Sequence, residues 1–515
     1  MVTKALLEVS MEGLGKNGVT SIFPCGIFQY KKGVNDKPGT PNYDLKRLAL
    51  KSTAMRIYPN WCNMDWSNNY NALKQDRKQK QEYIDSLKGK DYNKLIDIIM
   101  KNNSIVMNKL GIYVEIDDEG YKHIKVDETE RPIEFFNTMG CRTVNLFDIN
   151  ALDNFKRNVQ CVIEERFDDI DDVFSAIQKD GRGNICPVTI ILPTLAAMTK
   201  KKIVAKYGDE NPRSDEHTEM IWNEFIKLVD KKLHEAKDML LERFNHIASQ
   251  SFKSARFMYE NHTMSGYHKE EGIISALKHG TIVIGQLGLS EALYILFGFD
   301  HTTERGMEYA KEIEQLWLDR TGEFKKEYKM NFGVYYTPAE NLCHTSFNKF
   351  RKAYPEFDLE NVTWFYNENG EKEYKKYFTN SMHVPVYDNI DVFEKIDIES
   401  QLTGYSNAGC ITYVELSSTA FNNIDAIEKI VDYAMDKDIP YFALNFPLNR
   451  CADCGEPIYD EELNKCPKCG CDKIIRLGRI TGYLSTTVEH FNNGKKAEFY
   501  DRVDHIGQSL YKSDC

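Results

Sequence analysis

The C-terminal part of the chain contains, at residues 451–484, the sequence CADCGEPIYDEELNKCPKCGCDKIIRLGRITGYL. It contains two Cys-x-x-Cys pairs separated by eleven residues, whose members are Cys451, Cys454, Cys466 and Cys469. Four thiolates at this spacing satisfy the tetrahedral coordination of Zn²⁺ and leave no position open for a substrate. The spacing therefore predicts a structural zinc ribbon. Cys471 is a spare thiol that could replace one of the four.

Directly after the cysteine pairs, Gly482 stands inside the sequence RITGYL. Such a glycine is ordinarily a turn or a bulge. A zinc ribbon followed by RxxGYL resembles the glycyl-radical loop of anaerobic (class III) ribonucleoside-triphosphate reductases. In that family the glycine of this motif stores the radical on its Cα, which the resemblance assigns to Gly482. Glycine suits this role, because a Cα radical delocalises into both flanking amides only where no side chain prevents flattening. A loop held by a bound metal keeps its conformation even where its own side chains pack weakly.

A second motif is TMGCRT at residues 138–143, which places Cys141 between a glycine and an arginine. An isolated cysteine is usually a small buried apolar residue. In the resembled family the cysteine of this MGCR motif is the thiyl-radical site, carried on a finger loop at the centre of a barrel. The resemblance implies that Cys141 takes the hydrogen atom from C3′ of the substrate ribose, so that Gly482 and Cys141 form the catalytic pair.

The run FGVYYTPAENLC at residues 332–343 predicts a short strand that ends at a Thr-Pro pair. Proline fits the first turn of a following helix, whose free N–H groups and dipole favour phosphate. The run closely matches the family, where this turn lies at the substrate triphosphate. The resemblance assigns substrate binding to Thr337, Pro338, Ala339 and Glu340. An ordinary strand–helix junction is the alternative.

Three further residues are secondary candidates. His383 stands in FTNSMHV, similar to a family strand end, and is either a core residue or a substrate contact. Glu415 is a carboxylate in an apolar strand, which is costly unless it is paired. Ile191 occupies the position where formate-dependent members usually carry Asn, and an apolar side chain cannot replace its hydrogen bonds. Formate and a redoxin-type protein therefore both stay open as the reductant.

The composition limits the classes of protein to which the chain can belong. The chain has 515 residues, 42% of them apolar, and a net charge of −12. The length allows a large core, and the negative charge argues against a nucleic-acid-binding surface over the whole molecule. Without a run of about 18 apolar residues or a signal sequence, we expect a cytoplasmic protein without a membrane span. Thirteen cysteines, of which four form the metal motif, indicate a reducing compartment and argue against disulfides.

The predicted elements favour an α/β architecture. A strand at 411–416, a helix at 424–437 and a strand at 441–446 follow one another, and 218–248 has the apolar spacing of a long helix. The resemblance implies a ten-stranded α/β barrel of the glycyl-radical and ribonucleotide reductase type. The expected domains and insertions are a barrel portion at 1–445 with surface insertions at about 67–130 and 146–180, a zinc ribbon at 446–475, and a glycyl-radical loop and tail at 476–515.

The implied function is anaerobic reduction of ribonucleoside triphosphates to deoxyribonucleoside triphosphates for DNA synthesis. The family implies an allosterically regulated, ATP-binding homodimer and an activase, an iron–sulfur protein that uses S-adenosylmethionine to install the radical. Members carry further sequence before the strand near residue 24, including a second active-site cysteine. We therefore expect a separate N-terminal reductase chain; Cys25 or Cys62 is the alternative source of that thiol.

Two other functions remain as alternatives. Another glycyl-radical enzyme, such as a carbon–carbon lyase, would share the barrel and glycine loop but is not expected to carry a zinc ribbon and MGCR in this order. A non-catalytic zinc-ribbon protein would keep the four cysteines and would need neither Cys141 nor the turn at 337–340.

Overall fold

The structure is a computed structural model. It describes residues 1–15, 18–21, 24–129, 138, 144, 146–170, 183–208, 215–261, 263–264, 266–367, 369–417, 420, 422–446, 448–458, 463–480, 483–485 and 490–505. Both predicted radical residues, Cys141 and Gly482, lie outside the described residues.

The first sheet has the strand order β1-β2-β11-β10. Its strands are β1 (Ile27–Tyr30), β2 (Asn60–Asn63), β10 (Thr412–Glu415) and β11 (Tyr441–Asn445). β1 runs parallel to β2 and β10 runs parallel to β11, whereas β11 is antiparallel to β2. The predicted strand–helix–strand unit is confirmed, because helix α16 (Ile424–Asp436) connects β10 to its parallel neighbour β11.

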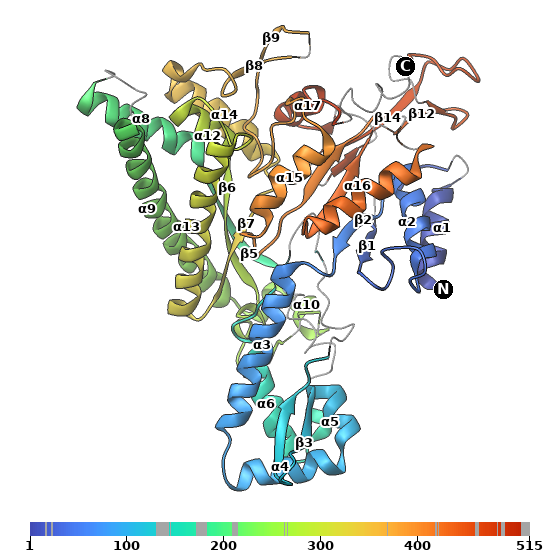
Figure 1. The fold of residues 1–515 in the computed structure, drawn as a ribbon, viewed down its shortest axis with the longest axis vertical. Coiled ribbons are helices and arrows are strands. Elements are labelled where there is room, and N and C mark those ends of the chain that lie inside the picture. Colours follow the sequence, from blue (N-terminus) through green and yellow to red (C-terminus); the bar gives the residue numbers. More distant parts are fainter. Residues whose placement is uncertain are drawn as a thin grey trace.

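Side chains of this sheet alternate between two faces, as the pleat requires. Trp61, Val414 and Phe442 belong to an outer core that packs against the helices beside the sheet. These helices are α1 (Val2–Glu12), α2 (Tyr43–Arg56), α15 (Val392–Thr403) and α16, which extend from α15 at the centre of Figure 1 to α1 at its right. Tyr413 and Tyr441 belong to a separate cluster on the inner face. The inner face therefore remains available for a site.

The second sheet consists of the parallel strands β5 (Asn184–Ile191), β6 (Thr281–Leu287) and β7 (Asn331–Tyr335). Every residue of β6 and β7 is buried, as is typical of parallel strands covered by helices. The surrounding helices are α8 (Leu192–Tyr207), α9 (Asp215–Ala248), α12 (Leu289–Phe297), α13 (Glu304–Tyr328) and α14 (Asn341–Ala353). The long helix predicted at 218–248 is confirmed by α9.

The two sheets meet at the segment that enters β10. Ala408 donates its backbone N–H to Val334 of β7 at 3.0 Å, and Tyr336 donates to Gly409 at 3.1 Å. The sheets together hold seven strands. The described residues therefore do not form the closed ten-stranded barrel that was expected: they form sheets of four and three strands joined by two backbone bonds of one loop.

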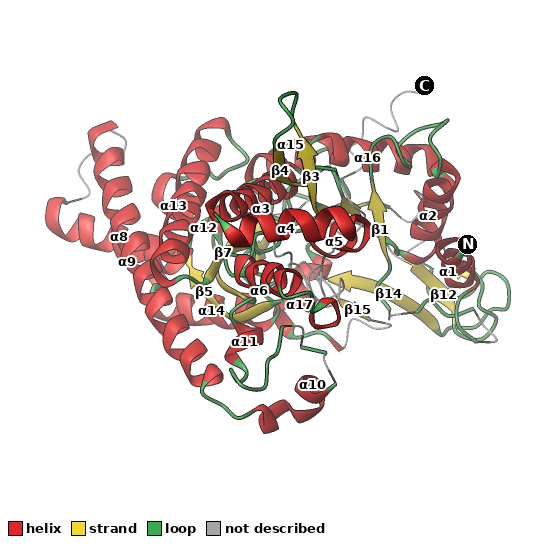
Figure 2. Ribbon diagram, turned by 90° about the horizontal axis from the view of Figure 1, so that it is seen from below, coloured by secondary structure: helices red, strands yellow, loops and turns green. Residues whose placement is uncertain are grey.

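Both predicted insertions contribute to one lobe, which projects below the sheets in Figure 1 and faces the viewer in Figure 2. Its elements are α3 (Ser67–Ser86), α4 (Lys90–Lys101), α5 (Asn103–Leu110), β3 (Ile112–Ile116), β4 (Lys122–Val126), α6 (Ala151–Ile163) and the 3-10 turn Phe167–Asp169. Leu95 and Ile99 from the first segment share a buried core with Val159 and Val162 from the second. The lobe therefore has its own core.

The remaining described elements are short or belong to the C-terminal part. They are α10 (Arg256–Glu260), α11 (Ile274–Leu277), β8 (Trp364–Tyr366), β9 (Lys372–Tyr374), β12 (Leu448–Cys451), β13 (Pro457–Ile458), β14 (Ile474–Ile480), β15 (Tyr483–Ser485), α17 (Asn493–Tyr500) and the 3-10 turns Phe252–Ala255 and Pro355–Phe357. Among the helices of the described residues, none combines the length and apolar character needed to cross a membrane.

Candidate functional site

The four motif cysteines converge. Their sulfur atoms all lie within 4.8 Å of one another, with 3.4 Å between Cys451 and Cys469 and 3.6 Å between Cys454 and Cys466. A tetrahedral zinc site with Zn–S bonds near 2.3 Å requires sulfur–sulfur distances of about 3.8 Å. The donor set and its spacing therefore fit Zn²⁺, and this four-cysteine group could hold the metal.

A glycine closes each half of the metal group. Gly455 donates its N–H to the carbonyl of Cys451 at 3.1 Å, and Gly470 donates to Cys466 at 2.9 Å. Both glycines have φ near +72°, a conformation that side chains disfavour. The backbone N–H of Cys454 lowers the pKa of the Cys451 thiol to about 6, which favours the thiolate that a metal needs.

β14 leads from the metal group to the predicted radical position. It pairs with β12 on one side and with β15 on the other. In the β14–β15 pair Ile480 is opposite Tyr483, so the described strands bracket Gly482. The cysteine group is therefore connected to this position by a paired strand.

Arg479 on β14 is buried and reaches the first sheet. Its guanidinium donates to Asn60 Oδ1 at 2.7 Å, and Asn60 Nδ2 donates to the Tyr441 hydroxyl at 2.6 Å. The guanidinium carbon also lies 5.0 Å from the ring centre of Tyr58 and 5.4 Å from that of Tyr413. An arginine side chain, unlike lysine, combines a flat cationic group that can lie over aromatic rings with several directed N–H donors. Arg479 therefore anchors the strand before Gly482 on the inner face of the first sheet.

The described residues on either side of Cys141, Thr138 and Val144, lie at the inner face of the first sheet. The backbone of Thr138 hydrogen-bonds the Cys62 thiol and opposes the burial that raises the pKa of that thiol. Burial also raises the pKa of Tyr441, while the amide of Asn60 and the nearby side chain of Thr138 act in the opposite direction. Val144 is buried in the inner-face cluster and donates its N–H to Ala408 at 3.1 Å. Tyr441 therefore lies between residues that flank Gly482 and residues that flank Cys141.

The predicted substrate turn follows β7. Thr337 Oγ1 lies 2.9 Å from Thr189 Oγ1 of β5, and Ser381 donates its hydroxyl to the Thr337 carbonyl at 3.2 Å. Gly285 makes room for this contact, because a Cβ atom there would lie 1.9 Å from Thr337 Oγ1. The prediction that Pro338 occupies the first turn of the helix was wrong, since α14 begins three residues later at Asn341. The longer loop is stabilised by its own hydrogen bonds.

The turn ends at an uncapped helix N-terminus. Ala339 is buried and Glu340 is exposed, and Cys343 donates its thiol to the Glu340 carbonyl at 2.9 Å. Among the described residues, no side-chain hydrogen bond caps α14. The first N–H groups of the helix therefore form a suitable position for an anion.

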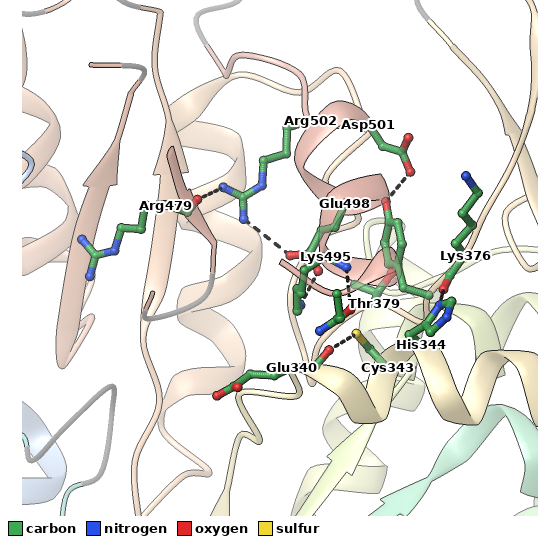
Figure 3. Close-up of polar contacts among 12 residues, drawn as sticks. Glu340, Cys343, His344, Lys376, Thr379, Arg479, Lys495, Glu498, Asp501 and Arg502 are labelled. Atoms are coloured by element: carbon green, nitrogen blue, oxygen red, sulfur yellow. Dashed lines mark hydrogen bonds and ion pairs between the residues drawn. The ribbon is translucent and has the colours of Figure 1, made fainter. Parts of the chain in front are cut away.

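The tail helix α17 packs directly on α14. A Cβ atom at Gly494 would lie 2.5 Å from the Cβ of His344, so the two helices approach closely. Lys495 and Glu498 of α17 form a buried ion pair. Figure 3 shows this helix above Cys343 and His344. The described tail after Gly482 therefore covers the start of α14.

Arg502 connects the tail to the sheet. It forms an ion pair of 3.4 Å with Glu498 and donates to the carbonyl of Arg479 at 2.9 Å (Figure 3). It also forms an ion pair of 2.9 Å with Glu415 Oε1. Asn445 Nδ2 also donates to Glu415. The expectation that Glu415 needs a partner is confirmed, because its buried carboxylate has both an ionic and a neutral partner.

His383 belongs to a neighbouring buried ion network. Its Nδ1 lies 3.2 Å from Glu399, and Lys395 lies 3.8 Å from the same carboxylate. Burial alone would raise the pKa of Glu399, but His383 and Lys395 outweigh it and hold the value at about 2. Lys395 also lies 3.1 Å from Nε2 of His505, whose pKa burial keeps well below its usual value. His383 therefore has a structural partner, and the proposed substrate contact stays a prediction.

Comparison with known proteins assigns the family. A family model described as anaerobic ribonucleoside-triphosphate reductase matches residues 1–505. The chain belongs to this family. This assignment favours neither a carbon–carbon lyase nor a non-catalytic zinc-ribbon protein.

Similar proteins have the same description. The anaerobic ribonucleoside-triphosphate reductase of Escherichia coli (strain K12) is 27% identical over 522 residues, which cover 98% of this chain and 57% of that protein. The enzyme of Enterobacteria phage T4 is 27% identical over 515 residues, with coverage of 98% and 66%. The chain thus spans a little over half the length of the Escherichia coli relative.

Solved structures show the same fold at low sequence identity. A structure called anaerobic ribonucleotide reductase aligns with a TM-score of 0.54 and 17% identity, covering 98% of this chain and 58% of the other. The Thermotoga maritima enzyme in complex with dATP and CTP aligns with a TM-score of 0.52 and 16% identity, covering 96% and 59%.

The sequence analysis of this reductase-family chain missed several residues of the site. Arg479 was part of the quoted RxxGYL motif, but only the glycine received a role. Asn60 and Asn445 are buried amides at the ends of their strands, and buried polar groups of this kind require partners. That signal could have identified them as inner-face residues. Arg502 had no local signal, because its partner Glu415 is distant in the sequence.

Proposed function

We propose that this chain carries the catalytic residues of an anaerobic ribonucleoside-triphosphate reductase, with Gly482 as the radical store and Cys141 as the hydrogen-abstracting thiol. Family membership supports the reaction. The observation that supports the residue pair is the position of Tyr441, whose hydroxyl bonds Asn60, the partner of Arg479, and contacts Thr138. Flanking segments of both residues thereby meet at one face of one sheet.

The proposed chemistry begins at Gly482, from which an activase removes one hydrogen atom. The Gly482 radical takes the hydrogen of the Cys141 thiol and leaves a thiyl radical. Cys141 then takes the hydrogen atom from C3′ of the ribose, and the 2′-hydroxyl leaves as water with the proton of the 3′-hydroxyl. Two electrons and two protons, from formate and solvent or from a dithiol protein, reduce the intermediate. Return of the hydrogen to C3′ restores the thiyl radical.

The substrate triphosphate is proposed to lie at the start of α14. Thr337, Pro338, Ala339 and Glu340 would line it, because the first N–H groups of that helix have no side-chain cap. The exposed carboxylate of Glu340 is unsuited to phosphate, so we assign it to the sugar hydroxyls or to the loop. Ile191, at the end of β5 in the same sheet, cannot hydrogen-bond formate, which keeps a protein reductant open.

The zinc ribbon is proposed to hold the Gly482 loop through β14. Zn²⁺ bound by Cys451, Cys454, Cys466 and Cys469 supplies no step of the reaction; these residues fix where β14 starts. We further propose that the two sheets form part of the family's barrel, that the protein acts as a homodimer, and that an activase is its partner. A separate N-terminal chain stays a prediction.

Electron paramagnetic resonance under anaerobic conditions tests this function. The chain would be co-expressed with a radical S-adenosylmethionine activase, with wild type compared against Gly482→Ala. We expect a glycyl doublet and, after exposure to air, cleavage at residue 482 in wild type only. Substrate turnover should require both Gly482 and Cys141. A doublet that persists in the Gly482→Ala variant, or turnover by a Cys141→Ser variant, would contradict the assignment.

A further inference from the structure

A large cavity lies between the lobe and the second sheet. Its volume is about 830 Å³, within the range of small-molecule sites. Its walls come from α3, α6, the C-terminal end of α13 and residues 146–150. The cavity is therefore built by both segments of the lobe together with the main body.

Lysines dominate the charge of this cavity. Those that line it are Lys156, Lys325, Lys326 and Lys329. Asp153 is the single carboxylate among the described lining residues, and it lies 3.7 Å from Lys278, which is outside the lining. The protein as a whole has a net charge of −12. A strongly cationic cavity in an acidic protein is a local feature that concentrates anions.

Lysines in the last turn of a helix also complement the helix dipole, which offers a simpler explanation for α13. Two observations are not explained by the helix dipole. Lys156 comes from α6, a different element, and its ammonium lies 5.6 Å from the ring centre of Tyr83 beside the cavity. Lys325 is partly buried and lies over the ring of Phe147 at 5.6 Å rather than extending into water. Lysines of two elements therefore line the same cavity.

The rest of the lining suits an organic group. Leu146, Phe147 and Leu318 supply apolar surface, while Asn71 and Gln75 of α3 supply amide groups. Inorganic phosphate alone would fill only a small part of the volume. We infer that this cavity binds a phosphorylated organic molecule of nucleotide size, with the phosphates at the α13 lysines and the organic part on the Phe147 side.

The charge environment of Lys325 is consistent with a phosphorylated ligand. Burial lowers the pKa of Lys325 to about 8, against the attraction of Asp148. Asp148 is itself engaged by His279 at 2.6 Å and by Asn331 at 2.8 Å. A bound phosphate would give the partly buried ammonium a closer counter-charge. Leu146 lines the cavity and shares a buried cluster with Val144, so a ligand would also contact the segment that follows Cys141.

Lysine acetylation footprinting of the intact chain tests the inference without relying on catalysis. The probes are adenosine triphosphate and inorganic triphosphate, and the readout is mass spectrometry of each lysine. We expect the nucleotide to protect Lys325, Lys326 and Lys329 several-fold, at concentrations at least about tenfold lower than inorganic triphosphate. Lys231 and Lys232 on the exposed face of α9 serve as controls and should remain fully reactive.

Two variants separate binding from folding. Lys325→Gln should raise the nucleotide concentration needed to protect Lys326 and Lys329 at least about tenfold, whereas Lys325→Arg should keep protection close to wild type. Equal protection by both probes would overturn the organic part of the inference. Absence of protection, or equal protection of Lys231, would overturn the site. The footprint does not depend on the Gly482 radical, so failure here and failure of the proposed function are distinguishable.

Discussion

The guanidinium of Arg479 donates a hydrogen bond of 2.7 Å to Asn60 Oδ1, and this bond joins the strand before Gly482 to the second strand of the chain. Both residues are buried, so neither can exchange its partner for water at low cost. The bond therefore fixes how deeply β14 enters the inner face of the first sheet.

Replacement of Arg479 should disturb the radical without loss of the metal. Arg479→Lys keeps the charge but loses the planar contacts with Tyr58 and Tyr413, and we expect it to cost about 2 kcal/mol of local stability. The yield of glycyl radical should fall at least about tenfold while zinc content is unchanged. Arg450→Lys on β12 is the matched control and should retain the wild-type yield. Equal radical yields in both variants would contradict the anchoring role.

Removal of one partner of the Arg502–Glu415 pair should be more harmful than removal of both. Arg502→Met leaves the Glu415 carboxylate buried with only its amide partner, and we expect a loss of about 3–5 kcal/mol in the free energy of unfolding. Combination with Glu415→Gln should recover much of this loss. Denaturant titration of the two single variants and the double variant measures the coupling. Simple addition of the two single effects would show that the pair is not coupled.

Gly494→Ala should separate α17 from α14. The added methyl group would lie 2.5 Å from the Cβ of His344, and overpacking of this kind costs about 1–3 kcal/mol. Hydrogen exchange should accelerate in residues 493–500 but not in α9. Gly322→Ala in α13 is the control, because no atom lies within 4 Å of its added Cβ and alanine favours the helix. Similar exchange of α17 in both variants would argue against close packing.

Stability should depend on pH through Glu314 of α13, which is fully buried and accepts a hydrogen bond from Gln286. Burial raises the pKa of Glu314 to about 8, whereas an unfolded glutamate titrates near 4.3. The folded protein therefore binds this proton more tightly, so the associated stability is lost as the pH rises from about 4.3 to about 8 and changes little above that.

Replacement by glutamine removes this dependence. Relative to Glu314→Gln, the wild type should lose about 2 kcal/mol of unfolding free energy between pH 6 and pH 8. Thermal or denaturant unfolding of both proteins across this range provides the measurement. Parallel pH profiles would mean that Glu314 is ionised throughout.

The sequence predicted the elements whose signals are local. The apolar spacing of 218–248 identified α9, and the cysteine spacing identified a group whose sulfurs do converge. Boundaries that depend on tertiary contacts were predicted less well. The Thr337–Pro338 pair illustrates the cause: Thr337 contacts Thr189 and Ser381, and α14 begins only at Asn341.

Contacts between distant segments could not be predicted from the residues alone. The two inserted segments share one core, although nothing in either sequence points to the other. The ion pair of Glu415 and Arg502 likewise depends on the tail returning to β10. Cys141 and Gly482, which the motifs assigned most directly, lie outside the described residues, and their roles stay predictions.

The tail helix α17 buries Gly494, Lys495 and Glu498 rather than large apolar side chains. Arg502 and His505 continue the same pattern toward the sheet. A segment seated in this way would expose mainly groups that water solvates well if it moved away from α14. α17 could therefore separate from α14 and pack against it again without exposing an apolar surface of its own that promotes aggregation.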